Sequence, residues 1–97
     1  MSSIEVNLGS RPVKKGDVLG VEGEDYIIAI GEELYALSPA AFYIWRMCDG
    51  RSISELVDSA SSELGIPKDQ LKEVFVNIVT RLAEYGLVEL GSISKEK

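Results

Sequence analysis

The side chains that most often carry out chemistry in proteins are scarce in this chain. Histidine is absent and cysteine occurs once, as Cys48. The usual general base and the commonest metal ligand are therefore missing, and one cysteine cannot form a zinc cluster or a redox pair. Adjacent carboxylates occur at Glu24-Asp25 and Glu32-Glu33, but both pairs fall in expected turns, where solvent leaves them ordinary acids. We therefore expect a protein that is not an enzyme and that has no catalytic residues, metal site or cofactor.

The composition is that of one small globular domain. The chain has 97 residues, of which 45% are hydrophobic and 27% are charged. Ten basic and sixteen acidic residues leave a net charge of −6, which disfavours nucleic acid as a partner. The sequence contains neither a signal-peptide core nor an apolar run long enough to span a membrane. We expect a cytoplasmic protein with no membrane partner.

Short apolar runs alternate with glycine in the first part of the chain. The runs Val18–Val21, Tyr26–Ile30 and Leu34–Leu37 are rich in β-branched, aliphatic and aromatic residues, which predicts three strands. Tight turns are expected at residues 22–25 and 31–32, so the strands should form an antiparallel meander. Such a small sheet needs helices over one face, and one edge stays unpaired unless a partner binds it.

Three helices are expected after this sheet. Ser38-Pro39 predicts a helix start directly after the third strand, because serine can accept an unpaired backbone N–H and proline needs no donor there. Residues 52–55 form a capping box for the second helix, which ends at Gly65. The third and longest helix begins near Pro67 and ends at Tyr85-Gly86. The second and third helices resemble a helix-turn-helix pair.

These elements define the predicted fold. It is an α+β fold, helix-turn-helix-like in its second and third helices, with a three-stranded antiparallel N-terminal sheet followed by three helices. We expect one domain at residues 13–90, with flexible tails at residues 1–12 and 91–97. The last residues of the first tail should lead in an extended conformation into the sheet.

Three short segments stand in a distinctive order. Leu34–Ala41 has the sequence LYALSPAA, Cys48–Ile53 has CDGRSI, and Leu82–Val88 has LAEYGLV. In this order and spacing they resemble the PqqD-like family, which is named for a pyrroloquinoline quinone (PQQ) biosynthesis protein. Its domain is also called the RiPP recognition element, after the ribosomally made, modified peptides that it serves. Ser38-Pro39 stands where members commonly have asparagine and another residue, so the subfamily stays open.

The resemblance implies a winged-helix-like peptide chaperone without catalytic activity. Such a protein binds the leader part of a ribosomally made precursor peptide and presents it to a modifying enzyme, often a radical SAM protein. In the family the leader adds a strand to the third strand and lies in a groove against the third helix, so that backbone hydrogen bonds give affinity and alternate side chains give specificity. By position, the peptide-binding residues would be Glu33, Leu34, Tyr35, Ala36 and Leu37 on the strand, and Gln70, Glu73, Val74, Asn77, Ile78 and Arg81 on the helix.

Two alternatives remain open at this point. The first is a winged-helix DNA-binding transcriptional regulator with residues 67–85 as the recognition helix. Three basic side chains in that helix are offset by three acidic ones, which is unfavourable for binding a polyanion. The second is a scaffold protein that forms a homodimer, since an open sheet edge can pair with its own copy. The sequence pattern does not identify the precursor, the modifying enzyme, the product or the register of the bound peptide.

Overall fold

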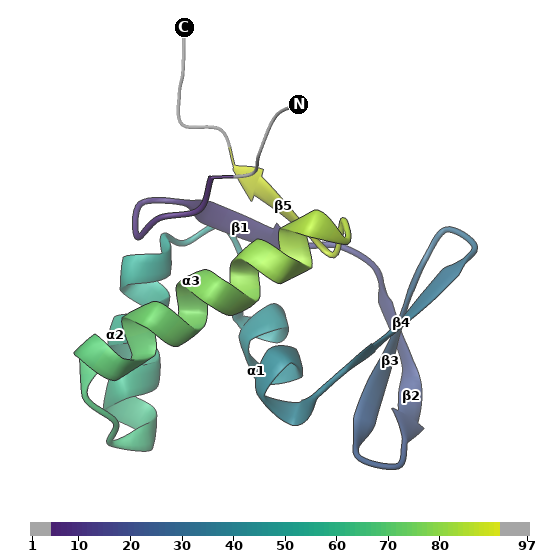
Figure 1. Ribbon diagram of the computed structural model, residues 1–97, viewed down its shortest axis with the longest axis horizontal. Coiled ribbons are helices and arrows are strands. Elements are labelled where there is room, and N and C mark those ends of the chain that lie inside the picture. Colours follow the sequence, from purple (N-terminus) through teal and green to yellow (C-terminus); the bar gives the residue numbers. More distant parts are fainter. Residues whose placement is uncertain (1–4, 92–97) are drawn as a thin grey trace, which may run out of the picture.

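The computed structural model describes residues 5–91 of the chain and contains two small sheets and three helices (Figure 1). In chain order the elements are β1 (Arg11–Lys14), β2 (Asp17–Glu22), β3 (Asp25–Ile30), β4 (Glu33–Leu37), α1 (Pro39–Met47), α2 (Ile53–Leu64), α3 (Lys68–Glu84) and β5 (Val88–Gly91). The α+β class and the order of three antiparallel strands followed by three helices are confirmed. The winged-helix likeness stays a prediction. Within the described residues, no helix combines the length and the apolar character needed to cross a bilayer.

The larger sheet is the predicted meander, with the strand order β2-β3-β4 and antiparallel pairing throughout. Each hairpin is closed by two residues, of which the first is a glycine at positive φ, 64° at Gly23 and 59° at Gly31. Glycine at this position is the signature of a type II′ turn, whose twist matches that of the strands. The sheet lies to one side of the helices and is joined to them through β4 and α1 (Figure 1).

The smaller sheet consists of β1 and β5, which pair antiparallel with Lys14 opposite Val88. An extended segment before the sheet is predicted from the sequence, but this pairing is not, because two segments from opposite ends of the chain carry no local signal for each other. The predicted tails begin or end at these strands. Residues 1–4 and 92–97 lie outside the described residues, and the flexibility of the tails stays a prediction. Within the first tail, the carbonyls of Leu8 and Ser10 each accept a 2.9 Å hydrogen bond from the first turn of α2.

Local capping explains where the helices begin and end. The Ser38 hydroxyl accepts a hydrogen bond from the Ala41 N–H at 3.2 Å, and Pro39 occupies the first helical position. At α2, Ser52 and Glu55 form the predicted reciprocal capping box, and Gly65 ends the helix at a φ of 73°. These caps place the start of α1 immediately after β4, so the sheet and the helices meet with no linker.

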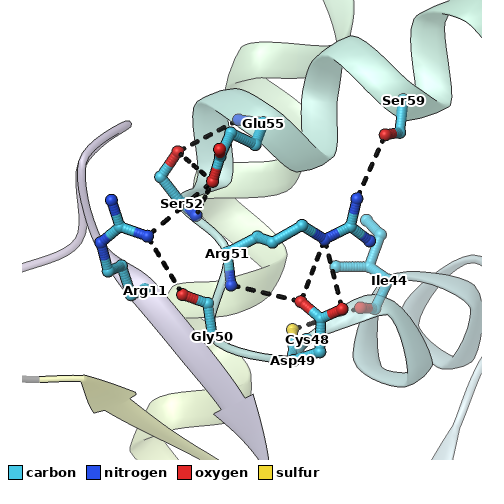
Figure 2. A network of polar contacts seen from close by, with 9 residues as sticks. All are labelled: Arg11, Ile44, Cys48, Asp49, Gly50, Arg51, Ser52, Glu55 and Ser59. Carbon is cyan, nitrogen blue, oxygen red and sulfur yellow. Dashed lines mark hydrogen bonds and ion pairs between the residues drawn. The ribbon is translucent and has the colours of Figure 1, made fainter.

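The turn between α1 and α2 is held by a polar network (Figure 2). The Arg51 Nε donates to both carboxylate oxygens of Asp49, at 3.1 and 3.2 Å, and these bonds hold the pKa of Asp49 below its usual value. Arg51 also reaches Ser59 on α2 at 3.3 Å. From β1, Arg11 donates to the Gly50 carbonyl at 3.3 Å. The network therefore connects this turn with α2 and β1.

The hydrophobic core lies between the three helices and is closed by both sheets. Trp45 of α1 is at its centre, and its indole Nε1 donates to the carbonyls of Leu87 at 2.9 Å and Lys15 at 3.2 Å. One turn earlier on α1, the ring of Phe42 lies against Trp45 and also stacks on Tyr26 of β3, with the ring centres of Phe42 and Tyr26 3.9 Å apart. Helix α1 therefore holds both sheets, and the position of β4 relative to α3 depends on it.

Candidate peptide-binding site

The outer edge of β4 offers free backbone hydrogen-bonding groups. Ile30 and Glu33 flank a two-residue loop, so they form a hydrogen-bonded pair. From there along β4, non-hydrogen-bonded and hydrogen-bonded pairs alternate. This register directs the N–H and C=O groups of Leu34 and Ala36 away from β3. In the part of the chain that the structure describes, no strand pairs with this edge. An extended peptide can therefore add a strand there.

A groove of about 460 Å³ lies between this edge and α3. Its walls come from the end of β4, the first turn of α1, and the second half of α3 with the residue that follows it. The lining residues are Ala36, Leu37, Ser38, Ala41, Asn77, Ile78, Arg81, Leu82 and Tyr85. Most of them are apolar, while the amide of Asn77 and the guanidinium of Arg81 can hydrogen-bond. The groove thus combines an apolar floor with a few polar groups, as peptide and small-ligand sites do.

A second hollow, of about 510 Å³, follows along the first half of α3. It is lined by Pro39, Ala40, Tyr43, Ile44, Leu64, Ile66, Gln70, Leu71, Val74 and Phe75. The two hollows together follow α3 from Gln70 to Tyr85, with the start of α1 between them.

The structure distributes the predicted peptide-binding residues over both hollows and the strand. Those that line the groove beside β4 are Ala36, Leu37, Asn77, Ile78 and Arg81, and those that line the second hollow are Gln70 and Val74. Glu33, Leu34 and Tyr35 lie in β4 but line neither hollow, and Glu73 is an exposed residue of α3 outside both. Their contact with a peptide stays a prediction.

Sequence analysis missed four residues of the groove, Ser38, Ala41, Leu82 and Tyr85. From the sequence, Ser38 is expected only as the cap of a helix. Tyr85 was interpreted only as the end of α3. A half-exposed tyrosine directly before the terminating glycine was the one available signal that this end of the helix has a second role.

Tyr85, which lines the groove, packs against Tyr35 of β4. The rings of Tyr35 and Tyr85 lie with their centres 5.5 Å apart and tilted by 34°. The Tyr35 hydroxyl donates a hydrogen bond to the Glu33 carboxylate, and this bond raises the pKa of Tyr35 above its usual value. The phenol therefore stays neutral at physiological pH and can line the path of a peptide without adding charge.

Arg81 of the groove and Cys48 of the core differ in what they offer to a ligand. Arg81 forms no ion pair with any residue among 5–91, so its guanidinium is available to a carboxylate or a carbonyl of a ligand. Cys48 lies in the core, and burial raises the pKa of its thiol to about 12. A thiol with this pKa remains protonated at neutral pH and is a poor nucleophile.

A small α+β domain with an open strand edge beside its longest helix is the class of protein that these observations define. A scan against protein-family models matches residues 18–88 to the family described as "Coenzyme PQQ synthesis protein D (PqqD)". Because the match covers most of the chain, the chain belongs to the PqqD family, which confirms the predicted resemblance. Members of this family are non-catalytic accessory proteins that bind a peptide and partner enzymes in PQQ biosynthesis. Comparisons with curated proteins and with solved structures found no match.

Proposed function

We propose that this protein is a peptide chaperone that binds the leader of a ribosomally made precursor peptide. It presents the precursor to a radical SAM or other peptide-modifying enzyme, in PQQ biosynthesis or a related pathway, and it acts in the cytoplasm. The observation that carries this proposal is the open edge of β4, which faces a groove along α3. Membership of the PqqD family supports it independently.

The geometry of the edge suits strand addition. Leu34 and Ala36 offer two donors and two acceptors in the spacing that an antiparallel strand requires. Alternate side chains of the added strand would point toward α3, where Leu37, Ala41 and Ile78 provide apolar contact. Backbone bonds at the edge give affinity for any extended chain, and the groove gives preference for particular side chains.

Backbone amide NMR of the labelled protein tests the proposal directly. The titrant is the leader peptide of a small precursor encoded beside the gene, and a DNA duplex is the control. We expect peptide alone to shift the amides of residues 33–37 and 77–85. If only the DNA shifts α3, and the shifts weaken with salt, the protein is a DNA-binding regulator and the proposal is wrong.

The DNA-binding alternative gains no support from α3 itself. Lys68 lies 3.1 Å from the Asp58 carboxylate and Lys72 lies 3.7 Å from that of Asp69. Two of the three basic side chains in this helix are therefore already paired with acids, and a phosphate backbone would have to displace them.

A further inference from the structure

Negative charge is concentrated on the three-stranded sheet. Between Gly16 and Trp45 the sequence contains no lysine or arginine, and its acidic residues are Asp17, Glu22, Glu24, Asp25, Glu32 and Glu33. These six carboxylates equal the net charge of −6, because the other ten acidic residues are matched by the ten basic ones. The sheet thus carries the net charge of the whole protein.

This charge is not compensated within the fold. All six side chains are exposed, and none of them forms an ion pair with any residue in the range 5–91. The ion pairs that the structure does contain lie among β1, β5 and the helices and their turns. A surface with one sign of charge attracts a partner of the opposite sign and speeds its association.

An apolar patch lies beside these carboxylates on β2. Val18, Leu19 and Val21 are 47%, 62% and 61% exposed, and we call them the β2 patch. Val18 lies opposite Ile28 and Val21 lies opposite Tyr26 on β3. Ile28 is buried and Tyr26 stacks on Phe42 of α1, whereas Val18 and Val21 are exposed, so the same face of the sheet is bare at its outer strand. Leu19 lies between them, at the bulge.

The composition of β2 is unusual for a free edge strand. Such strands are commonly protected from association by charged side chains, proline or bulges. Here a bulge between Val18 and Gly20 interrupts the ladder, but the residues around it are aliphatic and exposed. A partner would therefore contact mainly the side chains of the patch, because the bulge interrupts the row of backbone N–H and C=O groups. Asp17 lies at one end of it, and Glu22, Glu24 and Asp25 lie at the other.

We propose that the β2 patch is a docking surface for a second protein, whose contact segment carries aliphatic side chains flanked by lysine or arginine. The charge distribution argues against a second copy of this chain. Antiparallel contact between two β2 strands would bring Asp17 of one copy toward Glu22 of the other, and like charges in such positions repel. A cationic partner relieves the same repulsion, and nucleic acid is excluded by its charge.

This surface is separate from the groove beside β4. Strands β2 and β4 form opposite edges of the sheet, with β3 between them, so both can be occupied at once. The inference does not depend on what the groove binds. The two sites can therefore be tested, and can fail, independently.

The test uses the full labelled chain and three short capped peptides. One alternates lysine and valine, one alternates glutamate and valine, and one alternates lysine and serine. We expect the lysine–valine peptide alone to shift the amides of Asp17–Glu22, with an affinity that falls at high salt. The double variant Leu19→Ser/Val21→Ser should weaken this binding about tenfold, which corresponds to about 1.4 kcal/mol. Val13→Ser is the matched control, since Val13 is also exposed but lies on β1.

Four outcomes would overturn the inference. The first is that no peptide shifts β2, and the second is that the glutamate–valine peptide binds as well as the lysine–valine peptide. The third is concentration-dependent self-association in sedimentation that Leu19→Ser/Val21→Ser abolishes, which would assign the patch to a second copy. The fourth is that the lysine–valine peptide still binds the double variant and shifts amides of other elements, which would exclude the β2 patch as the docking surface.

Discussion

Replacing Trp45 by phenylalanine tests how the two sheets are held together. Trp45 is only 2% exposed and lies in the middle of the core face of α1. Its indole N–H is shared between the carbonyl of Lys15, which connects β1 to β2, and the carbonyl of Leu87, which precedes β5. Phenylalanine keeps most of the ring but has no donor.

The structure allows the cost to be worked out. The Leu87 carbonyl still accepts a 2.8 Å bond from the Lys15 N–H, so it remains satisfied in the variant. The part-buried Lys15 carbonyl loses its donor, and a polar group left unpaired there costs about 1–3 kcal/mol. The smaller ring adds about 1 kcal/mol for the space that it leaves. We expect a loss of about 2–4 kcal/mol, which for a domain of this size lowers Tm by about 10–25 °C.

Urea denaturation followed by far-UV circular dichroism measures this loss without relying on tryptophan fluorescence. Tyr43→Phe is the control, because the Tyr43 hydroxyl donates to Glu63 at an exposed site, at 2.8 Å. That bond is solvated, and its removal should cost at most about 0.5 kcal/mol. If Trp45→Phe costs no more than the control, the indole bonds do not hold the two sheets, and this part of the reasoning is refuted.

Three further predictions concern the backbone, pH and association. Gly16→Ala should destabilise the fold by about 2 kcal/mol or more, since φ is 98° at Gly16 and a Cβ would lie 2.9 Å from the Ala29 carbonyl oxygen. Gly20→Ala, where the space around the new Cβ is open, should be tolerated, and denaturation of the two variants measures the difference. Because burial raises the pKa of Cys48 from 9.0 to about 12, the unfolded chain loses this proton first as the pH rises above about 9. Stability should therefore fall from pH 9 toward 12, and denaturation of Cys48→Ala should show a smaller fall; equal slopes would contradict the assignment. If the protein forms a homodimer through the β4 edge, saturating leader peptide should dissociate it in sedimentation, and an unchanged dimer fraction would count against a shared edge.

Sequence analysis was most accurate where a few neighbouring residues decide the structure. The start of α1 at Ser38-Pro39 and the capping box at Ser52–Glu55 depend on hydrogen bonds within one helical turn. The glycines of the two hairpins act just as locally, through the positive φ that the turns require. These signals predicted the meander, the three helices and the direct passage from β4 to α1.

Sequence analysis failed where distant segments meet. Pairing of β1 with β5 depends on contacts between the two ends of the chain, and neither segment is distinctive alone. The site could be predicted only in part, because it too depends on contacts between distant segments. Helical spacing puts Gln70 and Ile78 on one side of α3, but only the tertiary position of α1 divides that side into two hollows. Spacing within a helix cannot predict where another element crosses it.

The central claim is that a leader peptide pairs with the edge of β4, and one pair of proline variants tests it most directly. Ala36→Pro removes a backbone donor that the register directs outward, which an edge strand tolerates. Val21→Pro is the matched change on the opposite edge. Val21 lies one residue before Glu22, whose pair with Asp25 flanks a two-residue loop, so its N–H is likewise directed outward. Calorimetric titration with the leader peptide should show that Ala36→Pro binds about tenfold more weakly than the unmodified protein, while Val21→Pro binds normally. Unchanged affinity in a folded Ala36→Pro variant would contradict the account.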